Sequence, residues 1–340
     1  MKQLSYQIYN YKIIKIIITI NLIIFFILFF KMKNHIKSEN KFISKNQINF
    51  DKNFDYLHYE NDIITEKMKK EAGWILTLDE VFLINGIIRK HKPKNCLEIG
   101  VARGGSSILI LNAIKDFSYS QLISIDLFIL RNKKGEFNNK IGYLVEQQFP
   151  ELMNKWRLFL GEMPHKILTK LNIKFDLFFL DTAHRSPGEF FDMIEVLPFL
   201  NENAIVILHD TMYHLLYPMT NYGNLYDAKF MPTQIYLMSS LIGEKLLIKK
   251  DKNDFINIGV VCLKEKQENY YLNYFLLIMN IWQYMPTNEQ LNDLRKFIKI
   301  YYKDSILLRI FDNSVEYNKK FFDNLKKRKY KLKYTLKMYY

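Results

Sequence analysis

The chain has 340 residues, a net charge of +14 and a hydrophobic fraction of 49%, so a large core is expected and wholesale disorder is not. Its lysines are scattered, and no arginine-rich stretch interleaved with aromatic residues precedes the C-terminus, so nucleic-acid binding is not expected. The two cysteines, Cys96 and Cys262, form no Cys-x-x-Cys pair, which excludes a cysteine-based zinc site and gives no reason to expect an oxidising compartment.

After a tail at 1–12, the chain carries an apolar stretch at 13–30 whose single charge is Lys15. As a helix it would span about 27 Å, close to the hydrocarbon thickness of a bilayer. Because no small-residue cleavage site follows, an uncleaved transmembrane helix is favoured over a signal peptide, with an interfacial helix or a misassigned start as alternatives. Lysines are more numerous after the stretch than before it, which favours a single-pass membrane protein with a cytoplasmic catalytic domain. The polar residues 31–70 are expected to form a spacer.

The region from Thr77 to Lys264 predicts an α/β fold. Apolar residues in 77–91 recur at helical spacing, and Asp79 lies near the start, where an acid suits the helix dipole. Later segments alternate between apolar runs and helical patterns, and the runs predict seven strands at 95–100, 121–126, 156–161, 175–181, 204–210, 245–250 and 256–264. Near-continuous apolar strands are typical of a sheet covered on both faces, so we expect a doubly wound, mostly parallel seven-stranded sheet ending in an antiparallel pair.

We assign 71–267 to the α/β domain and 268–340 to a helical, basic C-terminal extension. The extension closes with the sequence KKRKYKLKYTLKMYY. This tail fits either a solvated, frayed end or a patch for anionic lipid.

Ligands of such sheets bind at the carboxyl ends of the strands, where this chain places a glycine turn and two acids. The turn 100–105 reads G-V-A-R-G-G, a poor fit to the G-x-G-x-x-G pattern of dinucleotide-binding folds. Glu98 precedes the turn and suits a cationic or amino-bearing ligand better than a pyrophosphate. Asp126 ends the second strand, where an acid can accept hydrogen bonds from ribose hydroxyls. Together these features describe a site for a ribose-bearing cofactor with a charged amino-acid tail.

The segments LEIGVARGGSS, ISIDL, FDLFFLDTAH and AIVILHD resemble the class I S-adenosylmethionine (SAM) methyltransferases, and most closely their metal-dependent sugar and macrolide O-methyltransferases. The resemblance covers 77–264 and implies a Rossmann-like methyltransferase fold with SAM as cofactor. It implies cofactor contacts from Glu98, Gly100, Ala102 and Gly104 at the methionine part, Asp126 at the ribose and Glu162 near the adenine. Ala102 departs from the family, which usually has glycine there.

Two further strand ends carry the residues that could hold a metal. By the resemblance, Asp181, His209 and Asp210 match positions that bind a divalent metal, which clamps vicinal hydroxyls of the acceptor. Two carboxylates suit Mg²⁺, whereas the imidazole of His209 shifts the preference toward transition metals. The alternative is that Asp181 caps a helix and His209 packs at the sheet edge. His184 is the candidate general base, with an ordinary loop residue as the alternative.

A long tyrosine-rich loop at 211–229 follows the proposed site and is expected to act as a lid or binding loop. The expected activity is transfer of a methyl group from SAM to a hydroxyl of a sugar, a glycan or a similar small acceptor. An NAD-linked dehydrogenase is disfavoured by the broken glycine pattern. A membrane-anchored glycosyltransferase using a nucleotide-sugar and a SAM-binding module without turnover remain alternatives, and no oligomeric state is predicted.

Overall fold

The computed structural model describes residues 55–72, 76–131, 139–182, 184–211, 233–251 and 254–327. The predicted spanning stretch 13–30, the loop beyond Thr211 and the tail after Lys327 lie outside the described residues.

Within those ranges, no helix combines the length and the apolar character needed to cross a bilayer. The longest of them, α13 (Ser305–Lys327), carries charged side chains along its whole length, including Arg309, Asp312 and Glu316. This finding contradicts the single-pass membrane localisation predicted from the sequence.

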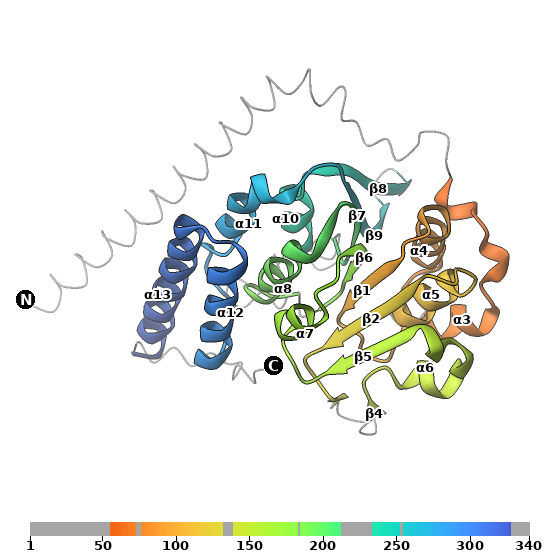
Figure 1. The fold of residues 1–340 in the computed structure, drawn as a ribbon, viewed down its shortest axis with the longest axis horizontal. Coiled ribbons are helices and arrows are strands. Elements are labelled where there is room, and N and C mark those ends of the chain that lie inside the picture. Colours follow the sequence, from red (N-terminus) through yellow and green to blue (C-terminus); the bar gives the residue numbers. More distant parts are fainter. Residues whose placement is uncertain are drawn as a thin grey trace, which may run out of the picture. The chain divides into compact units, whose positions relative to one another are not determined.

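The described part of the chain contains a seven-stranded sheet with the strand order β5-β2-β1-β6-β7-β9-β8 (Figure 1). Its strands are β1 (Asn95–Ile99), β2 (Gln121–Asp126), β5 (Trp156–Leu160), β6 (Phe175–Leu180), β7 (Leu200–His209), β8 (Gly243–Asp251) and β9 (Asp254–Leu263). The first five run parallel, whereas β9 is antiparallel to both β7 and β8. A short hairpin, β3 (Leu130–Arg131) with β4 (Asn139–Lys140), is separate. The predicted mostly parallel sheet with an antiparallel end is therefore confirmed.

Both faces of the sheet are buried, which explains why its strands read as continuous apolar runs. On β6, Phe178 and Leu180 join one apolar cluster, and Leu177 and Phe179 join the other. The first cluster includes residues of α7 (Pro164–Leu171) and α8 (Gly188–Val196), and the second includes residues of α4 (Leu78–His91) and α5 (Gly105–Ile114). Figure 1 shows these two helix pairs on opposite sides of the strands.

The C-terminal helices α11 (Tyr271–Leu277), α12 (Asn288–Tyr301) and α13 pack on the same cluster as α8. Trp282 meets Phe191 of α8 edge-on, with ring centroids 5.4 Å apart. The Tyr302 hydroxyl donates a hydrogen bond to the Ile194 carbonyl. The part of the extension that the structure describes is largely helical, as predicted, and it shares the core of the α/β sheet.

Helix α4 begins with a capping box, which confirms the predicted helix start. The Thr77 side chain accepts a hydrogen bond from the Glu80 amide, and the Glu80 carboxylate accepts one from the Thr77 amide. The second Glu80 oxygen accepts a hydrogen bond from the backbone N–H of Asn257 on β9, so the cap also connects α4 to the sheet. The other described elements are η1 (Tyr56–His58), η2 (Asn61–Ile63), α3 (Glu66–Ala72), α6 (Tyr143–Gln148), η3 (Pro150–Lys155), η4 (Leu197–Phe199), α10 (Thr233–Ser240) and η6 (Gln267–Tyr270).

Candidate active site

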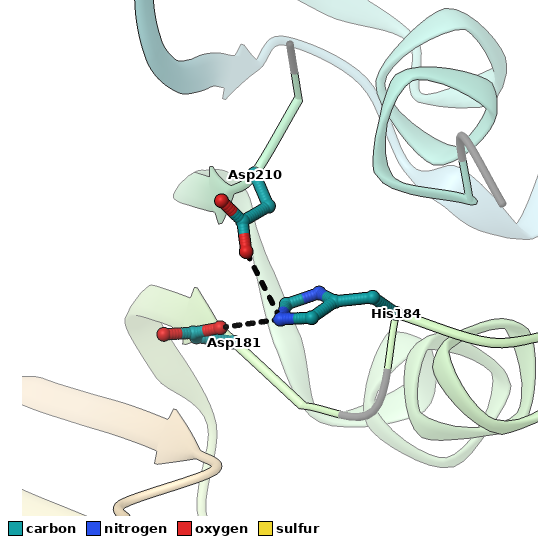
Figure 2. A group of neighbouring side chains, drawn as sticks. All are labelled: Asp181, His184 and Asp210. Carbon is teal, nitrogen blue, oxygen red and sulfur yellow. Dashed lines mark ion pairs between the residues drawn. The ribbon is translucent and has the colours of Figure 1, made fainter. Parts of the chain in front are cut away.

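Two aspartates and a histidine meet at the carboxyl ends of β6 and β7 (Figure 2). Asp181 follows β6 and Asp210 follows β7, and because these strands are parallel neighbours their ends lie side by side. His184, between β6 and α8, places Nε2 3.0 Å from Asp210 Oδ2 and 3.5 Å from Asp181 Oδ1. One nitrogen or oxygen atom of each residue lies within 4.8 Å of the others, so the three side chains converge on one point.

His184 is held from its other side by Glu189 of α8. Its Nδ1 lies 3.1 Å from Glu189 Oε1, and its backbone N–H donates to the same oxygen at 3.2 Å. A carboxylate only accepts hydrogen bonds, so Nδ1 carries the hydrogen and Nε2 is the atom presented to Asp181 and Asp210. The backbone of His184 is left-handed, with φ of 51°, which turns the ring back over the strand ends.

His209, the last residue of β7, lies behind this cluster. Its Nδ1 is 3.3 Å from Asp181 Oδ2 and 3.6 Å from Asp210 Oδ2, while Nε2 is 4.0 Å from Glu80 Oε2. Neither nitrogen has a hydrogen-bond partner of good geometry among the described residues. The sequence predicted His209 as a ligand and His184 as the base; both lie beside the two aspartates, and His184 is the one that forms a possible metal-binding group with them.

The alternating charges of the cluster control its protonation. Burial opposes a charged imidazole, but the carboxylates of Asp181, Asp210 and Glu80 outweigh it and raise the pKa of His209 to about 9. The pKa of His184 is likewise well above its ordinary value, because hydrogen bonds to Asp210 and Glu189 and the charge of Asp181 outweigh burial. Burial would raise the pKa of Asp181, but the two histidines hold it below its usual value. Without a metal, both imidazoles are therefore charged at neutral pH, and a metal bound at Nε2 of His184 would take the place of a proton.

The donor set fits a divalent metal. With hydrogen on Nδ1, His184 directs a lone pair toward two carboxylate oxygens, an arrangement that needs a proton or a cation between the three atoms. Asp210 is oriented for this, because its other oxygen, Oδ1, accepts a hydrogen bond from the side-chain amide of Asn257. His184 and Asp181 keep exposed side-chain fractions of 18% and 16%, whereas Glu189 is fully buried. One imidazole with two carboxylates suits Mn²⁺, Fe²⁺ or Zn²⁺ better than Mg²⁺.

The glycine turn touches this cluster directly. Gly100 has φ of 87°, and a Cβ there would lie 1.8 Å from the backbone oxygen of Asp181. The amide of Asp181 in turn donates to the carbonyl of Ile99 at 3.1 Å. Only glycine permits this approach, so the predicted cofactor turn and the predicted metal site share one wall.

Asp126, at the end of β2, braces the same turn. Its Oδ2 accepts hydrogen bonds from the amides of Val101 at 2.9 Å and Ala102 at 3.3 Å, and its Oδ1 accepts from Phe128 at 2.9 Å. Ala102 adopts a left-handed φ of 50°, the conformation that the usual glycine would take easily. Asp126 therefore lies where it was predicted, at the strand end beside the turn.

Two more of the predicted cofactor residues flank these groups. Gly104 caps the start of α5 with φ of 99°. Glu162 follows β5 and lies 3.6 Å from Lys166, and the preceding Gly161 amide donates to the Asp126 carbonyl at 2.9 Å. Gly104 and Glu162 thus lie, like Asp126, at the carboxyl ends of the parallel strands.

Glu98 is buried beneath the turn, with none of its surface exposed. Its oxygens accept hydrogen bonds from the hydroxyls of Ser106 at 2.6 Å, Ser107 at 2.7 Å and Ser124 at 2.6 Å. Burial raises the pKa of Glu98 to about 7, although these hydroxyls act in the opposite direction. The sequence placed Glu98 at the methionine part of a cofactor, whereas here it supports the turn from inside.

Several residues of the site were not predicted from the sequence, namely Glu80, Glu189, Thr233, Gln234 and Asn257. Glu80 could have been found from the capping-box pattern, Thr77 with a glutamate three residues later. The others lie on elements that approach the strand ends only through tertiary packing.

Comparisons with known proteins agree with the sequence pattern. A family model described as a methyltransferase domain matches residues 97–211, which confirms the methyltransferase resemblance over that segment. A search of curated proteins found no match.

Many solved structures resemble the chain, and the following three are among them. The SAH-bound methyltransferase PaMTH1 of Podospora anserina has 17% sequence identity and a TM-score of 0.44, and the match covers 59% of this chain and 89% of that one. The O-methyltransferase TomG of Streptomyces achromogenes, in complex with SAM, has 14% identity and a TM-score of 0.43, with 67% and 96% covered. An O-methyltransferase of Bacillus cereus, in complex with SAH, has 12% identity and a TM-score of 0.42, with 66% and 97% covered.

Proposed function

We propose that this chain, whose residues 97–211 match a methyltransferase domain, is a SAM-dependent O-methyltransferase that acts on a hydroxyl of a sugar or a similar small molecule. The observation that carries the proposal is the contact between Gly100 and Asp181. It joins a turn suited to a ribose-bearing cofactor to a cluster suited to a metal, which a metal-assisted methyl transfer requires side by side. Among the described residues, nothing favours the glycosyltransferase alternative.

In this proposal the glycine turn and Asp126 bind the cofactor. The Asp126 carboxylate is the hydrogen-bond acceptor for the ribose hydroxyls, and the turn supplies a surface that the methionine part can approach closely. Glu162, on the neighbouring strand end, is the residue proposed to lie near the adenine. SAM supplies an electrophilic methyl group, so these residues act mainly by aligning it with the acceptor oxygen.

Asp181, Asp210 and His184 are proposed to hold a divalent metal. Such an ion would lower the pKa of a bound acceptor hydroxyl and orient vicinal hydroxyls. Because Glu189 engages Nδ1 of His184, only Nε2 remains for chemistry, and that atom faces the two aspartates. We therefore assign His184 to the metal rather than to general-base catalysis. His209 lies beside the aspartates and offsets their negative charge.

Calorimetric titration of the full chain with SAM and, separately, with NAD tests the cofactor. We expect binding of SAM and not of NAD, and a loss of at least about tenfold in SAM affinity in Asp126→Asn, because a charged hydrogen-bond acceptor is removed. Asp176→Asn is the matched control. Asp176 also accepts hydrogen bonds from two backbone N–H groups, those of Lys94 and Asn95, but it lies at the amino end of β6, away from the proposed site. A folded chain that fails to bind SAM would overturn the proposed function.

A further inference from the structure

We infer that Glu189 is a positioning residue of the proposed metal site, which fixes His184 with Nδ1 protonated and Nε2 directed at Asp181 and Asp210. The inference rests on the proposed function. It concerns a buried glutamate on α8 that was not among the residues expected from the sequence pattern.

Donors from two separate elements converge on Glu189. His184 donates both its backbone N–H and Nδ1–H to Oε1. From α10, the Gln234 side-chain amide donates to Oε1 at 2.6 Å, and the Thr233 hydroxyl donates to Oε2. Buried carboxylates are stable when such donors satisfy both oxygens. Glu189 is thus held in place before it acts on His184.

This arrangement decides which ring nitrogen of His184 is available. A neutral imidazole carries one hydrogen, and the nitrogen that donates it is set by its partner. Glu189 can only accept, so the hydrogen stays on Nδ1 and the lone pair of Nε2 points at the aspartates. Metal-binding histidines commonly donate their second N–H to a carboxylate, and loss of that partner typically weakens metal binding. Glu189 meets this description in its contacts and burial.

Gln234 and Thr233 extend the support to α10. Gln234 is almost fully buried, and its Oε1 has no hydrogen-bond partner among the described residues, so its amide group is held through its nitrogen. A substitution of Gln234 that removes this donor should loosen Glu189 without touching His184. Such a substitution therefore tests the same inference while leaving Glu189 and His184 themselves unchanged.

The chain contains a matched control on the same helix. Glu195 is also fully buried on α8, and its Oε2 lies 2.9 Å from Nδ1 of His165. His165 packs against Phe297 of α12, with ring centroids 5.3 Å apart. In both pairs a buried glutamate of α8 accepts hydrogen bonds from the backbone N–H and from Nδ1 of a histidine, but only the Glu189 pair faces the two aspartates. Glu195→Gln therefore measures the general effect of removing such a carboxylate.

The test is titration of the chelator-treated full chain with Mn²⁺ alone, with free Mn²⁺ followed by its electron paramagnetic resonance signal. The variants are Glu189→Gln, Gln234→Met and Glu195→Gln. We expect Glu189→Gln to weaken Mn²⁺ binding by about 10- to 100-fold, Gln234→Met to weaken it less, and Glu195→Gln to leave it unchanged. With diamagnetic Zn²⁺ bound in place of Mn²⁺, correlation spectra of histidine nitrogens should show the His184 hydrogen on Nδ1 in the wild type and a changed state in Glu189→Gln.

Titration with SAM alone separates this inference from the proposed function. Unchanged SAM affinity in Glu189→Gln, with weakened Mn²⁺ binding, supports the positioning role. A wild-type chain that binds SAM but not Mn²⁺ overturns the inference and leaves the cofactor assignment standing. Equal Mn²⁺ affinities in wild type and Glu189→Gln, or equal losses in Glu189→Gln and Glu195→Gln, also overturn it. If Glu189→Gln fails to fold, the Gln234→Met titration decides: an unchanged Mn²⁺ affinity refutes the role.

Discussion

Replacing Glu98 by glutamine should remove a loss of stability that the wild-type protein undergoes between about pH 4.5 and pH 7. The carboxyl group is fully buried under the glycine turn and accepts hydrogen bonds from the hydroxyls of Ser106, Ser107 and Ser124. Burial raises its pKa from 4.5 to about 7, the hydroxyls oppose that rise, and the charge of Asp181 adds to it. The folded protein therefore binds this proton more tightly than the unfolded chain does.

The size and sign of the effect follow from this difference. Below pH 4.5 both states of the protein are protonated at Glu98, and the contribution to stability is fully present. It is lost as the pH rises through about 7 and changes no further above that. At ~1.4 kcal/mol for each pH unit, the loss is on the order of 3 kcal/mol. Glutamine keeps the shape of the protonated acid and cannot ionise, so it removes this slope.

Urea unfolding of both proteins, followed by tryptophan fluorescence across this pH range, measures the effect. The free energy of unfolding of Glu98→Gln minus that of the wild type should increase by on the order of 3 kcal/mol as the pH rises, and then level off. Ser107→Ala removes a hydroxyl that lowers the pKa of Glu98, so it should move the transition to higher pH. A difference that is constant with pH, or that decreases, would refute burial as the cause.

Two further substitutions test the packing of the site and of the C-terminal helices. Gly100→Ala forces a left-handed backbone and a clash with the Asp181 carbonyl, so it should lower the free energy of unfolding by about 2 kcal/mol or more and abolish SAM binding in calorimetry. Gly105→Ala, which meets no atom closer than 3.4 Å, should do neither, and equal effects would contradict the assigned contact. Phe311→Ala should cost about 3–5 kcal/mol in urea unfolding, because the side chain is 1% exposed against the sheet's cluster. Ile306→Ala, on the same helix but 51% exposed, should change stability by less than ~0.5 kcal/mol, and equal losses would show that α13 does not share the core.

The sheet could be predicted because its strands are buried on both faces. Each strand then reads as a short apolar run between turn residues, and this signal does not depend on distant parts of the chain. The limits of β7 differ from the predicted 204–210. Strand β7 begins at Leu200, before the apolar run at 204, because its backbone pairs with Phe175 of β6. The β3–β4 hairpin was not predicted, since two residues per strand carry no periodic pattern.

The predicted strand ends correctly indicated where the acidic residues of the site lie. Asp126, Asp181 and Asp210 each end an apolar run, and the rule that parallel strands share a carboxyl edge brings them together. The approach of the His184 ring to the aspartates was not predictable, because the sequence does not show which way a loop histidine turns. The left-handed backbone of His184 and its contact with Glu189 decide that.

By itself the sequence determined the methyltransferase-like α/β sheet, the glycine turn and the acids around it, because these depend on local apolar patterns and on strand ends. Tertiary structure alone decided the burial of Glu98 under three serines and the approach of His184 to the two aspartates. It also decided the support that Gln234 gives to Glu189. Ser124 reaches Glu98, and Gln234 reaches Glu189, from elements that are distant in the chain, so only the packing of the sheet and of α8 with α10 brings these partners together.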